Sequence, residues 1–511
     1  MSTRAGSGIP VSRRLLLAVL AMIAVTPFVV VPGFLYPFVV PRAAWFRVLA
    51  AAGLVLLAWR AAGGRTTLRT WRRERVGLAL AVFAAAVTVA AAAGADPRQA
   101  LLGGMIRMGG AVAWLHYVVF FLLLRWALDE ETWLPFLRLV VLVSGAVAAW
   151  SLLQAYGGGW FGIALFGWDQ GRIVGPLGLA GPLAAYLLLS AAVAGYLAAR
   201  AEGRPARIGW SLVAAVELWV VLLTGTRAAL VGAAAAALAL GAWAVAARGR
   251  GSRVRRLAVW GLAAVGLVAV GIALLGERAF PGVERLLDLG PDALASRLPL
   301  WRSAWSGFLE QPVLGVGPEG FDLVFDRHFR PGDYLAADAA HHDRAHNVLL
   351  GTLVETGAVG LAAYLGFWAA ALGSAYVALR RSEAEPGTLW LAAGVLAYFV
   401  YLMLWFEDLS SFQLLLVVLA YLEHRRLRGG PDRPGHEVGA SRPDRDPGPS
   451  PDAPSSPVAA RAPAVGAAVV LLAGVGWYHA QVLAASRATR DGMAAREPLA
   501  PFEHLDRALA R

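Results

Sequence analysis

Long apolar stretches recur along most of the chain and limit what it can fold into. A helix of roughly 20 apolar residues crosses the hydrocarbon core of a bilayer. Thirteen such stretches can be identified, at residues 15–32, 43–60, 77–95, 109–127, 134–156, 177–198, 208–225, 228–247, 257–275, 350–379, 388–406, 410–423 and 464–484. Backbone inside lipid must satisfy its own hydrogen bonds, so these stretches predict transmembrane helices. We therefore expect an all-α, polytopic membrane protein with about 12 spans in one block and one C-terminal span.

The composition agrees with a membrane protein and excludes several kinds of site. Only 16% of the residues are charged and 58% are hydrophobic, whereas soluble domains carry about 25% charged residues. The 511 residues include no cysteine, which excludes disulfides, thiolate nucleophiles and zinc–thiolate sites. The net charge of +12 comes from arginine, since lysine is absent. In a membrane protein such charge indicates basic cytoplasmic loops and no nucleic-acid partner.

The arginines also predict which way the spans run. If the N-terminus is cytoplasmic, the cytoplasmic loops between alternate spans receive most of the arginines. The short loops on the outer side then hold only Arg42, Arg47, Arg98, Arg107, Arg172 and Arg227. The positive-inside rule therefore predicts a multi-pass protein of the bacterial cytoplasmic (inner) membrane with its N-terminus in the cytoplasm.

Changes in composition divide the chain into four parts. Residues 1–423 form the predicted twelve-helix core, which includes a large helical loop on the outer face at 276–349. Residues 424–462 are rich in Pro, Gly, Ser, Asp and Arg and predict a disordered cytoplasmic linker. An extra transmembrane helix is expected at 463–485. Residues 486–511 predict a short helical outer tail that resembles the start of a helical repeat.

The outer loop carries several residues that could do chemistry. Residues 292–309 place apolar side chains at helical spacing, which predicts an amphipathic helix at the membrane interface or packed beneath the loop. His342 and His346 are four residues apart, so they could bind a metal with Asp338 and Asp343. Alternatively, these histidines belong to a solvated loop. In a third interpretation His346 is a general base, because an imidazole pKa near 6.5 suits proton abstraction.

Charged side chains at membrane depth are further candidates. Glu217 lies in the middle of the seventh span, and an ionisable residue there is a functional candidate by default. Arg227 lies about 15 Å further along the helix, too far to pair easily with Glu217. Guanidinium groups match phosphate geometry, so Arg227, Arg297 and Arg172 together could hold a diphosphate. For Arg172, snorkelling to the interface is the alternative.

Three segments resemble the O-antigen ligase and O-antigen polymerase superfamily of membrane glycan transferases. Residues 343–365 resemble its outer-face His-Asn followed by a helix with Leu, Glu and Gly at set offsets. Residues 296–321 resemble its Arg, Trp and Pro-x-x-Gly-x-Gly pattern, and Thr224 with Arg227 resembles its Thr-x-x-Arg element. The matching positions are His346, Asn347, Leu350, Leu353, Glu355, Gly357, Gly360, Leu361, Arg297, Trp301, Pro312, Gly315, Gly317 and Phe321. The C-terminal span and tail resemble members that carry tetratricopeptide repeats.

The resemblance implies an inverting glycan transfer on the outer face of the membrane. The donor would be a polyprenyl diphosphate-linked glycan, and the acceptor a sugar hydroxyl, as on a lipid A core, with no metal or other cofactor. It implies that His346 is the base and that Arg227 and Arg297 stabilise the diphosphate. The implied substrate-binding residues are Arg172, Asn347, Arg344, Trp301 and Glu355.

Other functions stay open at this point. Members of the same superfamily polymerise O-antigen or exopolysaccharide, or transfer oligosaccharides to protein side chains. A transporter also fits twelve spans, although inverted repeats and broken midplane helices are not evident in the sequence. A non-catalytic assembly protein is the third class. The enzyme hypothesis predicts that Arg227, Arg297 and His346 converge on one outer-facing cavity.

Overall fold

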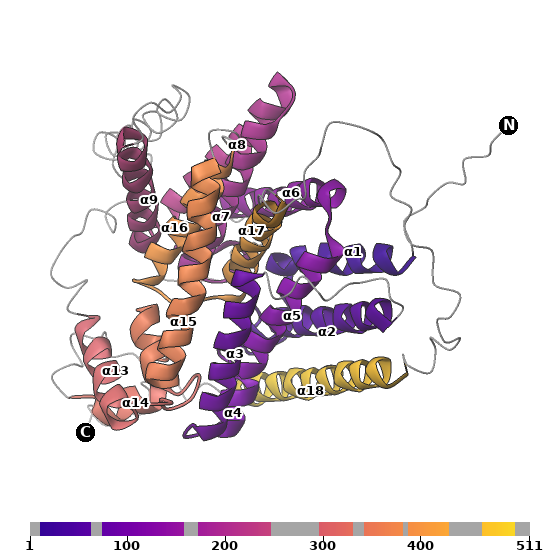
Figure 1. Cartoon of the computed structure of the whole chain (residues 1–511). Helices are drawn as coiled ribbons and strands as arrows, with labels where there is room; N and C mark the ends of the chain where they lie inside the picture. The colour runs from indigo at the N-terminus through magenta and orange to yellow at the C-terminus, as the bar shows by residue number, and fades with distance from the viewer. Residues whose placement is uncertain are drawn as a thin grey trace.

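The computed structural model describes residues 11–62, 74–157, 172–246, 296–330, 342–381, 387–428 and 462–495. Within these ranges the chain is helical and contains no strand (Figure 1). The α-helices are α1 (Val11–Ala24), α2 (Val40–Ala62), α3 (Arg75–Ala93), α4 (Pro97–Leu102), α5 (Ala111–Ala127), α6 (Glu130–Tyr156), α7 (Ala180–Arg200), α8 (Arg204–Leu223), α9 (Arg227–Ala246), α13 (Leu298–Glu310), α14 (Phe321–His328), α15 (Val348–Arg381), α16 (Thr388–Leu402), α17 (Leu409–Arg428) and α18 (Ala462–Ala495). The predicted all-α fold is confirmed.

Many of these helices can cross a membrane. In the described ranges, seven are long and apolar enough, and three shorter ones are apolar. The chain is therefore a multi-pass membrane protein. Twelve of the thirteen predicted spans coincide with helices, whereas 257–275 lies outside the described residues, as do residues 429–461 of the linker and 496–511 of the tail. The first span is shorter than predicted, because α1 ends at Ala24 and a 3-10 turn containing Pro27 follows.

Helix α7 is the centre of the bundle. Within its apolar 18-residue stretch, 94% is buried inside the protein. The helix packs against α6, α8, α9, α16 and α17. Small residues allow this close approach, as is usual between helices in membranes. Any Cβ added at Gly181 would lie 2.6 Å from the ring of Trp405, and one at Gly195 would lie 2.7 Å from the ring of Trp390.

Helix α15 is interrupted at Gly357, where the outer loop crosses it. Gly357 has φ 63° and ψ −168°, so the helix breaks there. Residues 312–317 run alongside this break and exchange backbone hydrogen bonds with it, including Ala358 N to Pro312 O at 2.9 Å and Gly317 N to Glu355 O at 2.9 Å. Two of the three segments that resemble the family therefore form one backbone crossing.

Replacing Gly357 with alanine is expected to destabilise the protein strongly. The added Cβ would lie 2.2 Å from the carbonyl oxygen of Val313, and the left-handed backbone alone costs about 1–3 kcal/mol for other residues. Thermal unfolding in detergent measures the effect. Gly366→Ala in the same helix is the control, because its Cβ would meet nothing within 4 Å. Equal unfolding temperatures for the two variants would contradict the role of the crossing.

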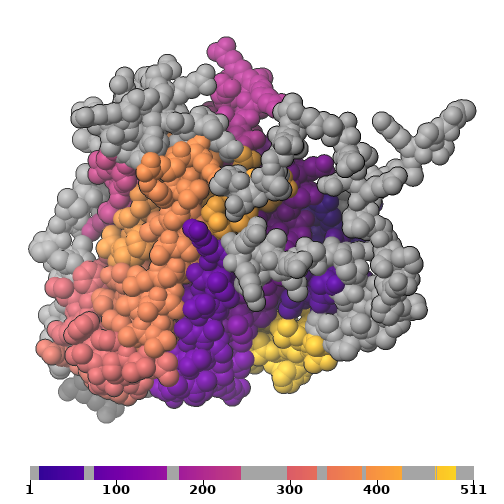
Figure 2. Space-filling model, in the orientation of Figure 1, coloured from indigo at the N-terminus to yellow at the C-terminus, as the bar shows by residue number. Residues whose placement is uncertain are grey.

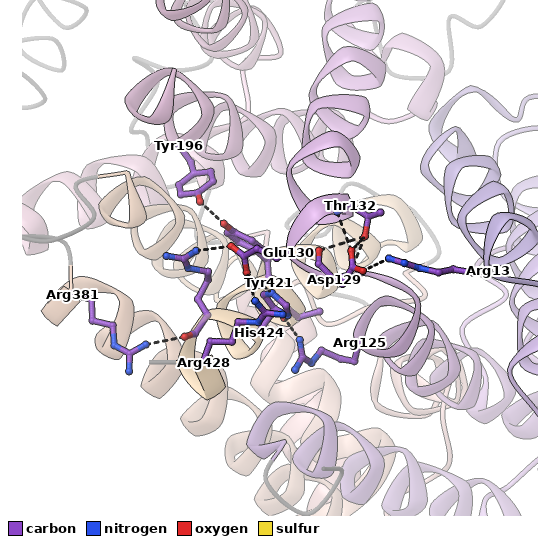
Figure 3. Close-up of polar contacts among 12 residues, drawn as sticks. Arg13, Arg125, Asp129, Glu130, Thr132, Tyr196, Arg381, Tyr421, His424 and Arg428 are labelled. Atoms are coloured by element: carbon purple, nitrogen blue, oxygen red, sulfur yellow. Dashed lines mark hydrogen bonds and ion pairs between the residues drawn. The ribbon is translucent and has the colours of Figure 1, made fainter. Parts of the chain in front are cut away.

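One end of the bundle is held by a group of ion pairs. Arg125 and Glu74 are both buried and pair at 2.8 Å. Nearby, Arg428 lies 2.9 Å and His424 Nε2 3.3 Å from the carboxylate of Glu130 (Figure 3). This is the end that the arginine distribution predicts to be cytoplasmic. The opposite end of α17, about 30 Å away along its 20 residues, leads to the candidate site.

Candidate functional site

A cavity of about 150 Å³ lies at the end of the bundle opposite these ion pairs. Parts of α2, α5, α15 and the start of α17 enclose it together with the loops that precede them. One part of its wall is aromatic, with Phe46, Phe83, Trp114 and Tyr117. The rest is rich in polar and charged side chains, namely Arg42, Arg47, Arg107, Arg344, His346, Asn347, Thr352, Glu355, Glu407 and Asp408.

His346 lies on the cavity wall in an unusual environment. Its ring centroid is 4.9 Å from that of Trp405 and 5.4 Å from that of Phe406. Burial, and next the positive charge of Arg297, lower the pKa of His346 to about 4. The imidazole is therefore neutral at pH 7, so one ring nitrogen has a lone pair that can accept a proton.

Backbone strain is concentrated around this cavity. Among the described residues, the non-glycine residues with positive φ are Met108 (54°), Glu319 (61°) and His346 (49°). Met108 and His346 line the cavity, and the Glu319 carboxylate accepts hydrogen bonds from the backbone N–H groups of Gly104 and Gly109. Strained conformations of this kind persist where the surrounding structure enforces them, and they cluster at functional sites.

Arg297 interacts electrostatically with Arg227 and with His346. Arg227 is the first residue of α9, and Arg297 immediately precedes α13. Burial, and then the charge of Arg227, lower the pKa of Arg297. The positive charge of Arg297 in turn helps to lower the pKa of His346. Arg297 is thus within electrostatic reach of both Arg227 and His346. Of the three, only His346 is among the described residues that line the cavity wall.

Arg172 holds the turn that precedes Arg227. Its Nε and Nη2 donate to the carbonyl oxygen of Thr224 at 3.0 and 2.9 Å, and Nη2 also donates to Thr226 Oγ1 at 3.0 Å. These contacts fix the turn between α8 and α9. The structure therefore places Arg172 next to Arg227 in space, with its guanidinium engaged by this turn.

Asn347 begins α15. Its side-chain oxygen accepts hydrogen bonds from the backbone N–H groups of Leu349 and Leu350, both at 3.0 Å. This is the arrangement of a helix N-cap. The cap fixes the start of α15 directly after His346, so Asn347 sets the backbone that carries the histidine.

Arg344 and Glu355 form a largely buried pair on the cavity wall. Arg344 Nη1 donates to Glu355 Oε1 at 2.8 Å, and Arg344 Nη2 lies 3.7 Å from Glu319 Oε1. Burial alone would lower the pKa of Arg344, but the carboxylates of Glu355 and Glu319 raise it above its usual value. Arg344 therefore links the segment before α15 to the outer loop.

Replacing Arg344 with glutamine is expected to destabilise the protein by about 3–5 kcal/mol, because two buried carboxylates lose their cation. The matched control is Arg327→Gln, since Arg327 pairs with Glu310 at the same 2.8 Å but its side chain is 61% exposed. Exposed pairs contribute about 0–1 kcal/mol. Chemical unfolding in detergent gives both values. Similar losses in the two variants would contradict this account.

Trp301 packs in the outer loop. It contacts a small apolar core formed by Leu300, Ala304, Val316, Phe321, Val324, Phe325, Ala345 and Val354. Helix α13 confirms the predicted helix, and its small residues Ser303, Ala304 and Gly307 are buried. Leu298, Trp305 and Leu309 are exposed on the same helix. Figure 1 shows α13 and α14 together beside one end of α15.

Several cavity residues escaped sequence reasoning. Arg107 pairs with Asp343 through two hydrogen bonds of 2.6 and 3.0 Å. Burial would raise the pKa of Asp343, but these bonds and the charge of Arg107 lower it to about 2. Burial raises the pKa of Glu407 and Asp408. Two features of the sequence could have indicated these residues. Arg107 is one of the few arginines on the outer side, and Glu407 and Asp408 are acidic residues just before the twelfth span.

The metal hypothesis finds little geometric support in this part of the chain. The His342 and His346 ring centroids are 6.2 Å apart, and Asp343 is engaged by Arg107. No group of three or more potential ligands occurs among the described residues, although Asp338 lies outside them.

Comparison with known proteins identifies a domain that contains part of this site. Residues 210–365 match the family model described as O-Antigen ligase. A search of curated proteins found no match. The matched segment includes Arg227, Arg297, Trp301, His346 and Glu355.

Proposed function

We propose that this chain is an O-antigen ligase-like transferase, because residues 210–365 match the family model described as O-Antigen ligase. Members of this superfamily are membrane enzymes that transfer glycans. This chain would move a glycan from a polyprenyl diphosphate carrier to the hydroxyl of a sugar acceptor. The observation that most supports this is a neutral, half-buried His346 on the cavity wall that feels the charge of Arg297, which in turn feels the charge of Arg227. Cations that can hold a diphosphate thus lie near a base that can accept a proton.

The proposed reaction is a single displacement. His346 accepts the proton of the acceptor hydroxyl, and the hydroxyl oxygen attacks the anomeric carbon of the donor sugar. The bond between that carbon and the diphosphate oxygen breaks, and the polyprenyl diphosphate leaves with the electron pair. Attack from the face opposite the leaving group inverts the anomeric configuration.

The arginines would act on the leaving group. Negative charge grows on the diphosphate as the glycosidic bond breaks, and preorganised cations stabilise such charge best where water is partly excluded. Arg227 and Arg297 would fill this role, with Arg172 holding the turn before Arg227. Because guanidinium groups supply the positive charge, the proposed chemistry needs no metal or other cofactor.

The proposed site faces the outer side of the cytoplasmic membrane. Its cavity lies at the end of α5 and α17 opposite the basic ion pairs, and the positive-inside rule assigns the basic end to the cytoplasm. A lipid-linked donor would then reach the cavity from the outer leaflet. The acceptor would be a glycan such as a lipid A core, and the remaining partners are membrane lipids.

Transfer by the purified protein tests this proposal. The full chain is reconstituted with a polyprenyl diphosphate-linked oligosaccharide and offered a lipid A-core glycan, a growing polymer or a protein acceptor in parallel reactions. We expect transfer to the core glycan with inverted configuration, measured by mass spectrometry and NMR. Transfer to the polymer or the protein instead would reassign the acceptor. Retained configuration, or no transfer to any acceptor, would contradict the proposal.

A further inference from the structure

Helix α18 lies outside the matched domain but contacts the end of the bundle that holds the cavity. It packs along α2, and Figure 2 shows it at the surface beside the segment that includes α3 to α5. The Tyr478 hydroxyl donates to the carbonyl oxygen of Leu102 at 3.2 Å. Arg47, which lines the cavity, donates to the same oxygen at 3.4 Å. A C-terminal residue and a cavity residue thus hold the same point of the chain.

The chain that follows Leu102 forms part of the cavity wall. Met108 and Gly109 line the cavity, and Arg47 also donates to the Met108 carbonyl oxygen. The buried Met108 side chain packs in a cluster with residues of α2 and α18, namely Val40, Ala43, Tyr478, Val482 and Leu483. Helix α18 therefore supports this wall by both a hydrogen bond and apolar packing.

The same wall connects to the charged side of the cavity. The backbone N–H groups of Gly104 and Gly109 donate to Glu319. Glu319 lies 3.7 Å from Arg344, which pairs with Glu355 on the cavity wall. A shift of the wall would therefore move the carboxylate that helps to place Arg344.

A second contact from α18 holds another segment next to the cavity. Leu35 N donates to the buried Ser486 Oγ at 3.1 Å. At the next residue, the guanidinium of Arg487 lies 4.6 Å from the ring centroid of Phe34. This segment continues into Phe38, which lines the cavity.

We propose that α18 is a positioning element of the transferase site, and that Tyr478 and Ser486 are its positioning residues. They hold the wall at 102–109 and the segment at 34–38 in the geometry that transfer needs. The link to catalysis rests on the proposed function, whereas the link to the cavity wall does not. Small misplacements at a reacting centre can cost up to about 100-fold in rate.

The test combines two substitutions in the full chain, Tyr478→Phe and Ser486→Ala, which remove only the two hydroxyl groups. Hydrogen exchange of the peptide that covers 102–110 reports on the wall without substrate. We expect this exchange to rise at least about fivefold, and kcat for transfer to fall about tenfold. The KM for the donor should change less than about twofold, because Arg227 and Arg297 lie on other elements. Trp477→Phe is the control, since Trp477 is 69% exposed on the same helix.

Three results would overturn the proposal. The first is unchanged exchange at 102–110 in the double variant. The second is faster exchange together with wild-type kcat. The third is a loss of rate that the Trp477→Phe control shares. Failure of the wild-type protein to transfer any glycan would instead contradict the proposed function. The exchange measurement would then still decide whether α18 holds the wall.

Discussion

Replacing His346 with alanine is expected to reduce glycan transfer by roughly 100- to 10,000-fold, the usual contribution of a general base. The variant should keep its fold, because the cap of α15 comes from Asn347 and the crossing at Gly357 is untouched. The rate of transfer at saturating donor measures the loss of activity, and the unfolding temperature shows whether the fold is kept. His328→Gln is the matched control, because His328 pairs with Glu310 at 3.1 Å in the outer loop and is not among the residues that line the cavity.

The pH dependence of transfer checks the same role independently. Burial and Arg297 lower the pKa of His346 to about 4, so its neutral, proton-accepting form persists well below the ordinary value near 6.5. For the unliganded enzyme, kcat/KM should therefore fall on the acid side only as pH approaches about 4. An acid limb near pH 6.5, or transfer by His346→Ala within tenfold of wild type, would exclude His346 as the base.

Replacing Arg227 with alanine is the second large expected effect, a loss of roughly 100- to 1,000-fold in kcat. The reason is that the growing charge on the diphosphate loses a cation. Arg227→Lys should recover part of the rate, since lysine supplies the charge without the planar fork of donors. Alanine suits the first turn of α9, so the helix itself should survive.

Two further variants test the role of Arg227: a control at Arg138 and a double variant with Arg297. Arg138→Ala removes an exposed cation on α6, and we expect it to leave transfer unchanged. If Arg227 and Arg297 act on one group, the loss in the double alanine variant should be smaller than the product of the two single losses. Independent, multiplicative losses or full activity in Arg227→Ala would contradict a shared diphosphate.

The sequence predicted the helices and their class well. Apolar length and composition are local properties, and they marked twelve spans that the structure describes as helices. Errors occurred at their ends: the stretch 15–32 continued through Pro27, whereas α1 ends at Ala24. The family resemblance was also readable along the chain, because its residues occur in short segments with fixed spacing, and the match at 210–365 confirms it.

The roles of single charged residues were harder to predict. Asn347 was expected to bind substrate, yet its side-chain oxygen caps α15. Arg344 and Glu355 were expected to bind substrate as well, and they pair with each other. Arg344 and Glu355 are 11 residues apart, and their further neighbour Glu319 comes from the outer loop, so short-range spacing does not predict this group. The substrate-binding roles of these residues stay predictions.

The sequence by itself determined that this chain crosses a membrane many times, which end is predicted to be cytoplasmic, and which segments carry the ligase signature. These features depend on the transfer of apolar side chains into lipid and on local motifs, so neighbouring residues suffice to specify them. Only the tertiary structure decided that Arg42, Arg47 and Arg107 join His346 at one cavity and that α18 contacts its wall. Those contacts join residues hundreds of positions apart, and only the packing of α2 against α5 and α18 brings them together.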